Sequence, residues 1–288
     1  METGRNSRIL IVGGGSWATA LIKIISQNEN SISWWMRDES AIEHLKLHSH
    51  NPKYLQSAEF DMENITISSD LNTLIDDAET IVIAVPSAFV HDTFKEIKNE
   101  ALQDKFVFSA LKGMIPEMNV IPARYFHKNF GIPYSKIGII CGPCHAEEVA
   151  MERLSYLTVA CSELSVASEM AKKLECRYIR TSVSDDLFGT EFSAILKNVY
   201  ALATGISAGL GYGDNFQAVL ISNSIREIER FIDALHPIHR DTKTSAYLGD
   251  LLVTAYSKFS RNRTFGFMIG KGYSAKAAQL ETVSYTHL

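Results

Sequence analysis

One lysine, Lys197, is the first residue of this chain whose surroundings suggest chemistry. It lies in residues 191–204 (EFSAILKNVYALAT), which contain no glycine or proline and predict a helix. A lysine on a solvated helix face usually has charged or long polar neighbours. Two hypotheses stay open, a surface lysine with an extended stem and a catalytic lysine that projects into a cleft. Apart from Tyr200, the neighbours on its face, at steps of three, four and seven, are small: Thr190, Ser193, Ala194, Ala201 and Thr204.

A second pattern with chemical meaning opens the chain. Residues 8–12 (RILIV) predict a buried strand, a glycine turn and a helix follow, and residues 31–36 (SISWWM) predict another strand. Between the strands lies Gly13-x-Gly15-x-x-Ala18, a variant of the dinucleotide-binding fingerprint. The first glycine makes a tight turn, the second lets a pyrophosphate approach the backbone, and the alanine allows close packing of helix on strand. Because the helix start offers free N–H groups to phosphates, we expect a nucleotide-binding loop rather than a structural turn.

The residue after the second strand bears on the choice of cofactor. A carboxylate at this place binds a ribose 2′-hydroxyl, whereas an arginine suits a 2′-phosphate. Here Arg37 stands at about that place, with Asp38 behind it. We therefore expect NADP or NAD as cofactor, with NADPH favoured. The alternative is that Arg37 is a solvated strand end.

Further strands alternate with helices and loops as far as about residue 183. Lys112 follows the expected strand at 104–110 and therefore lies just past a carboxyl end, where open α/β sheets place their ligands. The alternative for Lys112 is an ordinary loop lysine. The strands are expected at 65–69, 79–85, 104–110, 137–141, 154–160 and 177–181.

Beyond about residue 184 the alternation stops and the chain predicts helices only. We expect an α/β N-terminal domain with a Rossmann-like, doubly wound sheet at residues 1–185, and an all-α C-terminal domain for substrate and catalysis at 186–288. Lys197 is on the first helix past this boundary, so it could reach a cleft between the domains. The helices are expected at 187–204, 214–234, 244–259 and from about 274.

Composition excludes several classes of protein. The chain has 288 residues, 46% hydrophobic and 21% charged, with a net charge of −5, which gives no support to nucleic-acid binding or a basic membrane-binding surface. No apolar run reaches the roughly 18 residues of a transmembrane helix, and no secretory signal precedes the first strand. Four cysteines without such a signal predict reduced thiols and a cytoplasmic protein.

Two of those cysteines imitate a redox site. Cys141-Gly-Pro-Cys144 is a C-x-x-C at a strand-to-helix turn, where a helix start could make Cys144 reactive. Thioredoxins have a tryptophan before the motif, whereas this chain has Ile139 and Ile140. We therefore favour packing of Cys141 inside the sheet over a working dithiol. No metal-ligand spacing is present, so we expect no metal.

Taken in order, the motifs of the chain resemble those of bacterial-type NAD(P)-dependent glycerol-3-phosphate dehydrogenase. Each motif alone is weak, but the ordered set is specific and covers roughly residues 8–281. Besides the glycine loop with Ser16-Trp17, the motifs are Val85-Pro86-Ser87, Leu111-Lys112-Gly113, Gly142-Pro143, Leu196-Lys197-Asn198-Val199, Gly249-Asp250-Leu251 and Ser260-Arg261-Asn262-Arg263.

The resemblance implies an oxidoreductase that interconverts dihydroxyacetone phosphate and sn-glycerol 3-phosphate and supplies glycerophospholipid synthesis. Lys197 would be the general acid and base, with Lys112 as the second catalytic residue. We expect a homodimer, a small phosphorylated three-carbon substrate, and neither nucleic acid nor membrane insertion. The implied substrate residues are Lys112, Gly142, Cys144, Lys197, Asp250, Ser260, Arg261 and Asn262. The implied cofactor residues are Gly13, Gly15, Ser16, Trp17, Ala18, Arg37, Lys112, Ala146 and Arg261.

The reduction of a ketone requires residues of these types. A hydride goes to carbon and a proton to oxygen, so the developing alkoxide needs an acid or cation nearby. A lysine suits this if burial or a neighbouring cation such as Lys112 lowers its pKa. Asp250 is the candidate that orients Lys197, and the pair Arg261 and Asn262 suits a phosphate because guanidinium groups bind it in bidentate fashion.

Several alternatives stay open. Another two-domain NADP reductase of the hydroxyacid type, a non-catalytic NADP-binding sensor and a thiol oxidoreductase are the competing functions. Residues 260–263 could instead be a helix C-terminus, where cations are favourable. The glycine-rich stretch 205–213 could serve close backbone packing or contact substrate.

The chain also departs from the family in two places. Cys144 stands where the family has Ser or Thr, which removes one hydroxyl hydrogen bond to substrate. Residues 282–288 do not match, and the family continues past Glu281, so we expect a truncation or a foreign tail.

Overall fold

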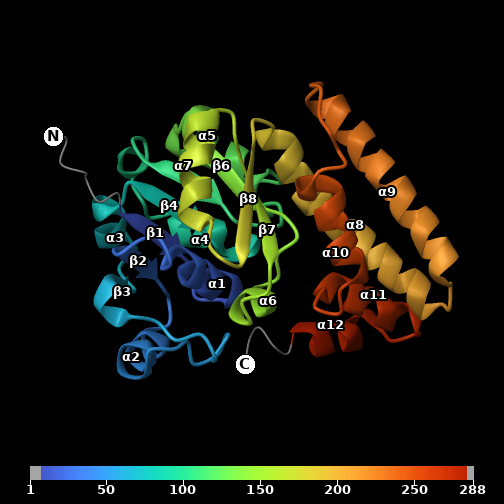
Figure 1. Cartoon of the computed structure of the whole chain (residues 1–288), viewed down its shortest axis with the longest axis horizontal. Helices are drawn as coiled ribbons and strands as arrows, with labels where there is room; N and C mark the ends of the chain where they lie inside the picture. The colour runs from blue at the N-terminus through green and yellow to red at the C-terminus, as the bar shows by residue number, and fades with distance from the viewer. Residues whose placement is uncertain (1–7, 284–288) are drawn as a thin grey trace. The chain divides into compact units, whose positions relative to one another are not determined.

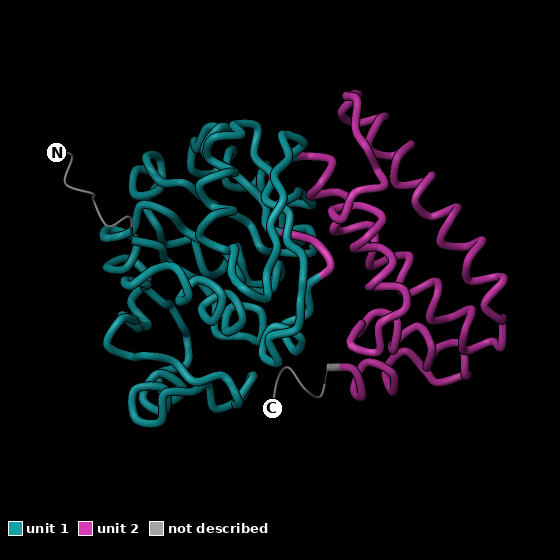
Figure 2. Tube along the Cα trace, viewed as in Figure 1, with its two compact units in different colours: residues 1–140, 144–187 teal, residues 141–143, 188–288 magenta. Residues whose placement is uncertain are grey.

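The computed structural model describes residues 8–283, which form two compact units (Figure 2). Unit 1 ends at Leu187 and unit 2 begins at Phe188, except that the short segment Cys141–Pro143 belongs to unit 2. This division lies two residues from the boundary expected at 185, and the two functional domains stay a prediction. The expected foreign tail falls mostly on residues 284–288, outside the described part of the chain.

Unit 1 is built on an eight-stranded sheet with the order β3-β2-β1-β4-β5-β6-β7-β8. Every strand pairing from β3 across to β6, and that of β7 with β8, is parallel. Strands β1 and β4 are buried along their whole length because they are short runs rich in β-branched residues, ILIV and TIVI. The strands are β1 (Ile9–Val12), β2 (Ile32–Trp35), β3 (Ile65–Ser68), β4 (Thr80–Ile83), β5 (Phe106–Ser109), β6 (Ile137–Cys141), β7 (Ser155–Cys161) and β8 (Ile179–Ser184).

All eight predicted strands are therefore present, and the Rossmann-like fold class is confirmed. The strand order reverses between β1 and β4, and such a switch point opens a crevice at the carboxyl ends of the strands. Helices connect and cover the strands (Figure 1). They are α1 (Ser16–Ile25), α2 (Glu39–His48), α3 (Leu71–Asp77), α4 (Val90–Phe94), α5 (Pro122–Phe130), α6 (Ala146–Ala150) and α7 (Leu164–Leu174), with short 3-10 turns at Met62–Asn64, Ser87–Phe89, Asn99–Ala101 and Tyr134–Lys136.

Unit 2 is helical in its described residues, as predicted. A π-helical turn, η5 (Ser245–Gly249), leads directly into α10. The α-helices are α8 (Leu187–Gly209), α9 (Asp214–Leu235), α10 (Asp250–Tyr256), α11 (Arg261–Gly270) and α12 (Ala275–Val283).

Two of these helices touch backbone to backbone. A methyl group on Gly205 or Gly209 of α8 would overlap main-chain carbonyls of α11, and one on Gly266 or Gly270 of α11 would overlap carbonyls of α8. The glycines are four residues apart on each helix, so they share one face. This contact explains half of the glycine-rich stretch, since Gly205 and Gly209 serve close packing.

The structure corrects three helix predictions. The lysine helix runs on to Gly209 because its glycines pack against α11 instead of ending it. The helix expected at 244–259 begins as a π-turn and ends at Tyr256. The region 260–263 starts a helix, with Ser260 as the N-cap, so the alternative of a helix C-terminus is wrong.

No helix among residues 8–283 is long and apolar enough to cross a membrane.

Candidate functional site

The glycine loop after β1 adopts the backbone that the fingerprint requires. Gly13 has a φ of +145°, and a Cβ there would lie 2.8 Å from the carbonyl carbon and oxygen of Ala84, directly after β4. Only glycine tolerates both conditions. Gly13 therefore lets the loop pass close to β4 at the switch point of the sheet.

Three side chains donate hydrogen bonds to three consecutive carbonyl groups of the loop. Trp34 Nε1 donates to the carbonyl of Gly13 at 2.6 Å, and Asn51 Nδ2 donates to that of Gly14 at 3.2 Å. Thr19 Oγ1 donates to the carbonyl of Gly15 at 2.9 Å. In a trans peptide the N–H points opposite to the carbonyl. The N–H groups that follow these three carbonyls therefore point away from the side chains that hold the loop.

These features fit a dinucleotide pyrophosphate. The first turn of α1 carries no acidic residue and no side-chain cap, so its N–H groups and dipole suit an anion. A Cβ on Gly15 would meet nothing within 4 Å. Ser16 is the first residue of α1, and Ala18 is buried below it. Within the described residues, the buried Trp17 Nε1 has no hydrogen-bond partner.

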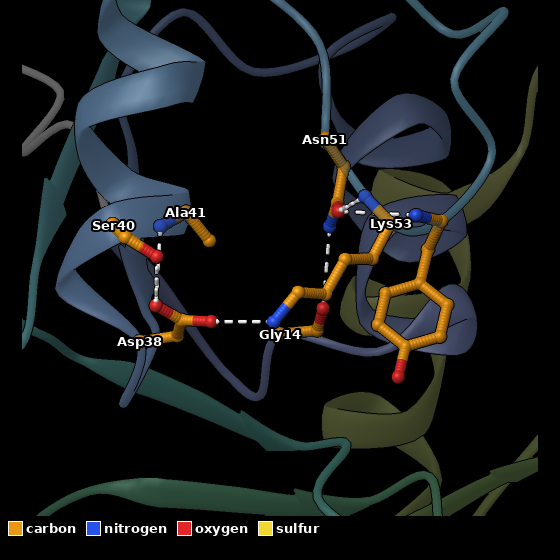
Figure 3. A network of polar contacts seen from close by, with 7 residues as sticks. Gly14, Asp38, Ser40, Ala41, Asn51 and Lys53 are labelled. Carbon is orange, nitrogen blue, oxygen red and sulfur yellow. Dashed lines mark hydrogen bonds and ion pairs between the residues drawn. The ribbon is translucent and has the colours of Figure 1, made fainter. Parts of the chain in front are cut away.

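The end of β2 carries a cluster of charges. The Arg37 guanidinium group lies over the ring of Phe89, 5.8 Å from its centroid. Asp38 caps α2 by accepting from the Ala41 N–H, and it pairs with Lys53 Nζ at 2.8 Å (Figure 3). The hydrogen bond from Lys53, with further help from Ser40, holds the pKa of the Asp38 carboxyl well below its usual range.

Lys112 lies beyond β5, as expected, and comes near the glycine loop. Its Nζ is 5.9 Å from the ring centroid of Trp17 in α1. The next residue, Gly113, packs so closely on Ser87 that a Cβ would lie 2.6 Å from its Oγ. The structure thus joins the motifs after β1, β4 and β5 at the carboxyl end of the sheet.

The turn after β6 contributes to both units. Gly142 has a φ of +124°, so glycine is needed there. Cys144 is 4% exposed and packs in the unit 1 core with Ala146, which begins α6. All four cysteines are free thiols, and Cys141 is fully buried. Burial of both thiols disfavours the working dithiol.

Lys197 is buried and paired with Asp250. Its Nζ donates a hydrogen bond to Asp250 Oδ1, and the two side chains are only 3% and 2% exposed. The small residues on its face are buried with it, from Thr190 at 0% to Thr204 at 1% exposure. The hypothesis of a surface lysine is therefore wrong. The predicted partner of Lys197 is confirmed, while a catalytic role stays a prediction.

The residues just before Asp250 contact α8 and the turn after β6. The hydroxyl oxygen of Tyr247 in η5 lies 3.4 Å from Thr190 Oγ1 of α8. A Cβ on Gly249 would be in ordinary contact with Pro143, at 3.7 Å. The Gly142-Pro143 turn thus lies beside the residue that precedes Asp250.

The remaining substrate candidates begin α11. Ser260 is 5% exposed and caps the helix by accepting from the Arg263 N–H at 3.4 Å. Arg261 and Asn262 form the exposed first turn, which has no acidic residue. A helix start with an arginine and an amide is a suitable phosphate site.

The candidates thus divide between the two units. Unit 1 joins the glycine loop, Arg37, Lys112, Cys144 and Ala146, whereas unit 2 holds the remaining substrate residues together with Arg261. Sequence reasoning missed Asn51 and Lys53 beside the cofactor loop, although Asn51-Pro52 is a turn signal. It also missed Tyr247 and Gln217, whose Nε2 donates from α9 to the Thr204 carbonyl of α8 at 3.2 Å.

Comparison with known proteins covers almost the whole chain. The family described as NAD-dependent glycerol-3-phosphate dehydrogenase N-terminus matches residues 8–171, and the corresponding C-terminus matches residues 186–286. A glycerol-3-phosphate dehydrogenase (NAD(P)+) of Clostridium botulinum is 32% identical over 94% of this chain and 81% of its own. One of Limosilactobacillus reuteri is 31% identical over 92% and 79%.

A solved structure gives the same result. The crystal structure of glycerol-3-phosphate dehydrogenase from Coxiella burnetii superimposes with a TM-score of 0.86 at 26% identity. The match covers 98% of this chain and 89% of that one. The similarity therefore extends through both units.

Proposed function

Since the chain belongs to the NAD(P)-dependent glycerol-3-phosphate dehydrogenase family, we propose that Lys197 is its general acid and base. In the reduction of dihydroxyacetone phosphate, Lys197 gives a proton to the ketone oxygen, and it takes the proton back when sn-glycerol 3-phosphate is oxidised. The observation that carries this proposal is the buried pair of Lys197 with Asp250. Asp250 holds the amine in one orientation and balances its charge.

Lys112 has a supporting role in this proposal. A bound nicotinamide would supply the hydride for the reduction and accept it in the oxidation. Lys112 stands beside Trp17 at the carboxyl end of the sheet, where its charge polarises the ketone and stabilises the developing alkoxide.

The start of α11 binds the substrate phosphate. Ser260 is committed to capping the helix, so Arg261 and Asn262 supply the side-chain donors. The helix dipole adds a favourable field for the anion. Cys144 offers a buried thiol where relatives offer a hydroxyl, so we propose that it contributes packing and little hydrogen bonding to substrate.

NADPH is the preferred cofactor in this proposal. Arg37 follows β2 and lies over Phe89, which keeps a cation at the edge of the sheet where a ribose 2′-phosphate would stand. Asp38 is occupied by its helix cap and by Lys53. It is therefore less available to a ribose hydroxyl.

We further propose that the product feeds glycerophospholipid synthesis in the cytoplasm. Free cysteines suit a reducing compartment. A homodimer is supported by exposed apolar side chains along α9, among them Phe216, Val219 and Phe231. Sedimentation of the purified chain tests the dimer.

The deciding experiment follows NADPH absorbance when dihydroxyacetone phosphate is added. Turnover should occur with this substrate and be much weaker with unphosphorylated dihydroxyacetone. Turnover with 2-keto acids instead would support the alternative of a hydroxyacid-type reductase. NADPH binding without any turnover would support the alternative of a sensor.

A further inference from the structure

Residues 51–54 connect two parts of the cofactor region of unit 1. Asn51 is 1% exposed and is engaged at both ends of its amide. Its Nδ2 donates to the Gly14 carbonyl at 3.2 Å and to Thr19 Oγ1 at 2.9 Å. Its Oδ1 accepts from the backbone N–H groups of Lys53 and Tyr54 at 3.0 and 3.1 Å. Asn51 therefore fixes this segment directly on the glycine loop.

From this anchored segment, the Lys53 side chain extends to the end of β2. In Figure 3 it runs from the Asn51 turn towards Asp38. Its Nζ pairs with Asp38 Oδ2 at 2.8 Å, while Asp38 Oδ1 accepts from Ser40 at 2.6 Å and from the Ala41 N–H. Each carboxylate oxygen thus already has a partner in unit 1.

The charges at this edge need Lys53 if a phosphate is to bind. Asp38 and Glu39 are the two acidic residues that follow Arg37. A phosphate monoester carries about −1.5 to −2 charges at pH 7, so these carboxylates repel it. Arg37 alone does not offset both of them. The Lys53 ammonium group neutralises Asp38 and brings the second cation.

The pair with Asp38 does not prevent Lys53 from binding an anion. The two side chains are 49% and 40% exposed, and exposed ion pairs add little to stability. An ammonium group also has three donors. Lys53 can therefore keep its bond to Asp38 while it donates to a phosphate.

We propose that Lys53 binds the 2′-phosphate of NADP(H) together with Arg37, and that Asn51 positions it by anchoring its segment on Gly14. This rests on the proposed preference for NADPH. Lys53 thereby sets the choice between the two cofactors, and Asn51 couples the ribose edge to the pyrophosphate loop.

Equilibrium binding, without turnover, tests the proposal. Calorimetry compares the affinity for adenosine 2′,5′-bisphosphate with the affinity for adenosine 5′-monophosphate. The proteins measured are the parent, Lys53→Met, Arg37→Met and Asp38→Asn. The control is Lys46→Met, which removes an exposed lysine from the last turn of α2. We expect Lys53→Met to weaken binding of the bisphosphate about tenfold, which is the scale of one charge-assisted contact. Binding of the monophosphate should change less than twofold.

The other variants make the outcome decisive. Asp38→Asn keeps a competent helix cap and removes a repelling charge, so bisphosphate binding should persist or strengthen. If Arg37→Met abolishes the discrimination while Lys53→Met keeps it, the role of Lys53 is refuted and the cofactor preference stands. If the parent itself binds both nucleotides alike, the preference and the role of Lys53 both fail.

Asn51 has its own readout. Asn51→Ala loosens the glycine loop as well as the segment, so both nucleotides should bind more weakly. Loss of the bisphosphate alone would mean that Asn51 acts only through Lys53. Unchanged binding of both would overturn its positioning role.

Discussion

Lys197 of α8 and Asp250 of α10 form an ion pair that is almost completely shielded from water. The two residues are 53 positions apart in sequence and meet because α8, η5 and α10 pack in one unit. Removing two charges from water costs several kcal/mol, which their mutual attraction repays only with good geometry. Such a pair is therefore weak evidence for stability. The proposed role in proton transfer would account for its presence.

Substitution of Lys197 by methionine should stop the chemistry and spare cofactor binding. We expect kcat to fall by about 10²–10⁴, the usual scale for a lost general acid. NADPH affinity, measured by fluorescence titration, should stay within about threefold because the cofactor residues lie mainly in unit 1. Unchanged turnover in this variant would remove the basis of the proposed mechanism.

Stability separates the structural role of the pair from its chemical role. Lys197→Met leaves a buried carboxylate without its lysine partner and should cost about 3–5 kcal/mol of unfolding free energy in urea. Adding Asp250→Leu removes that carboxylate, so the double variant should recover most of the loss and remain inactive. A double variant with restored turnover would show that the pair serves folding alone.

Arg261→Ala should mainly weaken capture of the phosphorylated substrate. Losing one charge-assisted contact to phosphate predicts a rise in KM for dihydroxyacetone phosphate of roughly 10- to 100-fold. Lys258→Ala is the matched control, because it removes an exposed cation just before the Ser260 cap. A selective loss of dinucleotide binding in Arg261→Ala would mean that its main partner is the cofactor.

The strands of unit 1 could be predicted because their signal is local. The run ILIV, for example, is apolar over four residues and lies between Arg8 and Gly13. The small residues Thr190, Ala194 and Ala201 beside Lys197 also indicate a position away from solvent, although this local pattern alone leaves a surface lysine open. These features depend on residues close together in sequence.

Features that depend on distant contacts could not be predicted. The π-turn at Ser245–Gly249 shifts the helix register before Asp250, and hydrophobic periodicity does not reveal such a shift. The pair of Lys53 with Asp38 spans 15 residues and depends on the anchor at Asn51. The predicted end of the lysine helix failed for a related reason, because glycine reads as a helix breaker until its packing partner is known.

Acid should weaken unit 1 through His44. Burial lowers the pKa of His44 below its ordinary 6.5, and the nearby His48 and His50 rings lower it further. The His44 and His48 ring centroids are 4.4 Å apart. Within the described residues, the buried His44 Nε2 has no hydrogen-bond partner. The unfolded chain then binds more protons than the folded one, so stability falls as pH drops below about 6.5 towards the folded pKa.

The expected result is a difference in slope. Unfolding free energy measured between about pH 7.5 and 5.5 should fall less steeply for His44→Gln than for the parent. His239→Gln, which removes an exposed histidine of unit 2, should keep the parent slope. Equal slopes for all three proteins would contradict the lowered pKa.

The glycine contact between α8 and α11 should determine both stability and substrate binding. α8 carries Lys197 and α11 begins with Arg261, so the crossing at Gly205 and Gly266 holds the two candidate residues in register within unit 2. A methyl group on Gly205 overlaps the Arg263 carbonyl, and backbone can yield only if the helices separate. We therefore expect Gly205→Ala to cost about 1–3 kcal/mol or more in urea unfolding. KM for dihydroxyacetone phosphate should rise as α11 shifts, and it should rise more than the KM for NADPH.

The control is Gly213→Ala, where an added Cβ meets nothing within 4 Å and only a weak helix cap is lost. If both variants unfold at the same urea concentration, the helices tolerate separation and this crossing does not position Arg261.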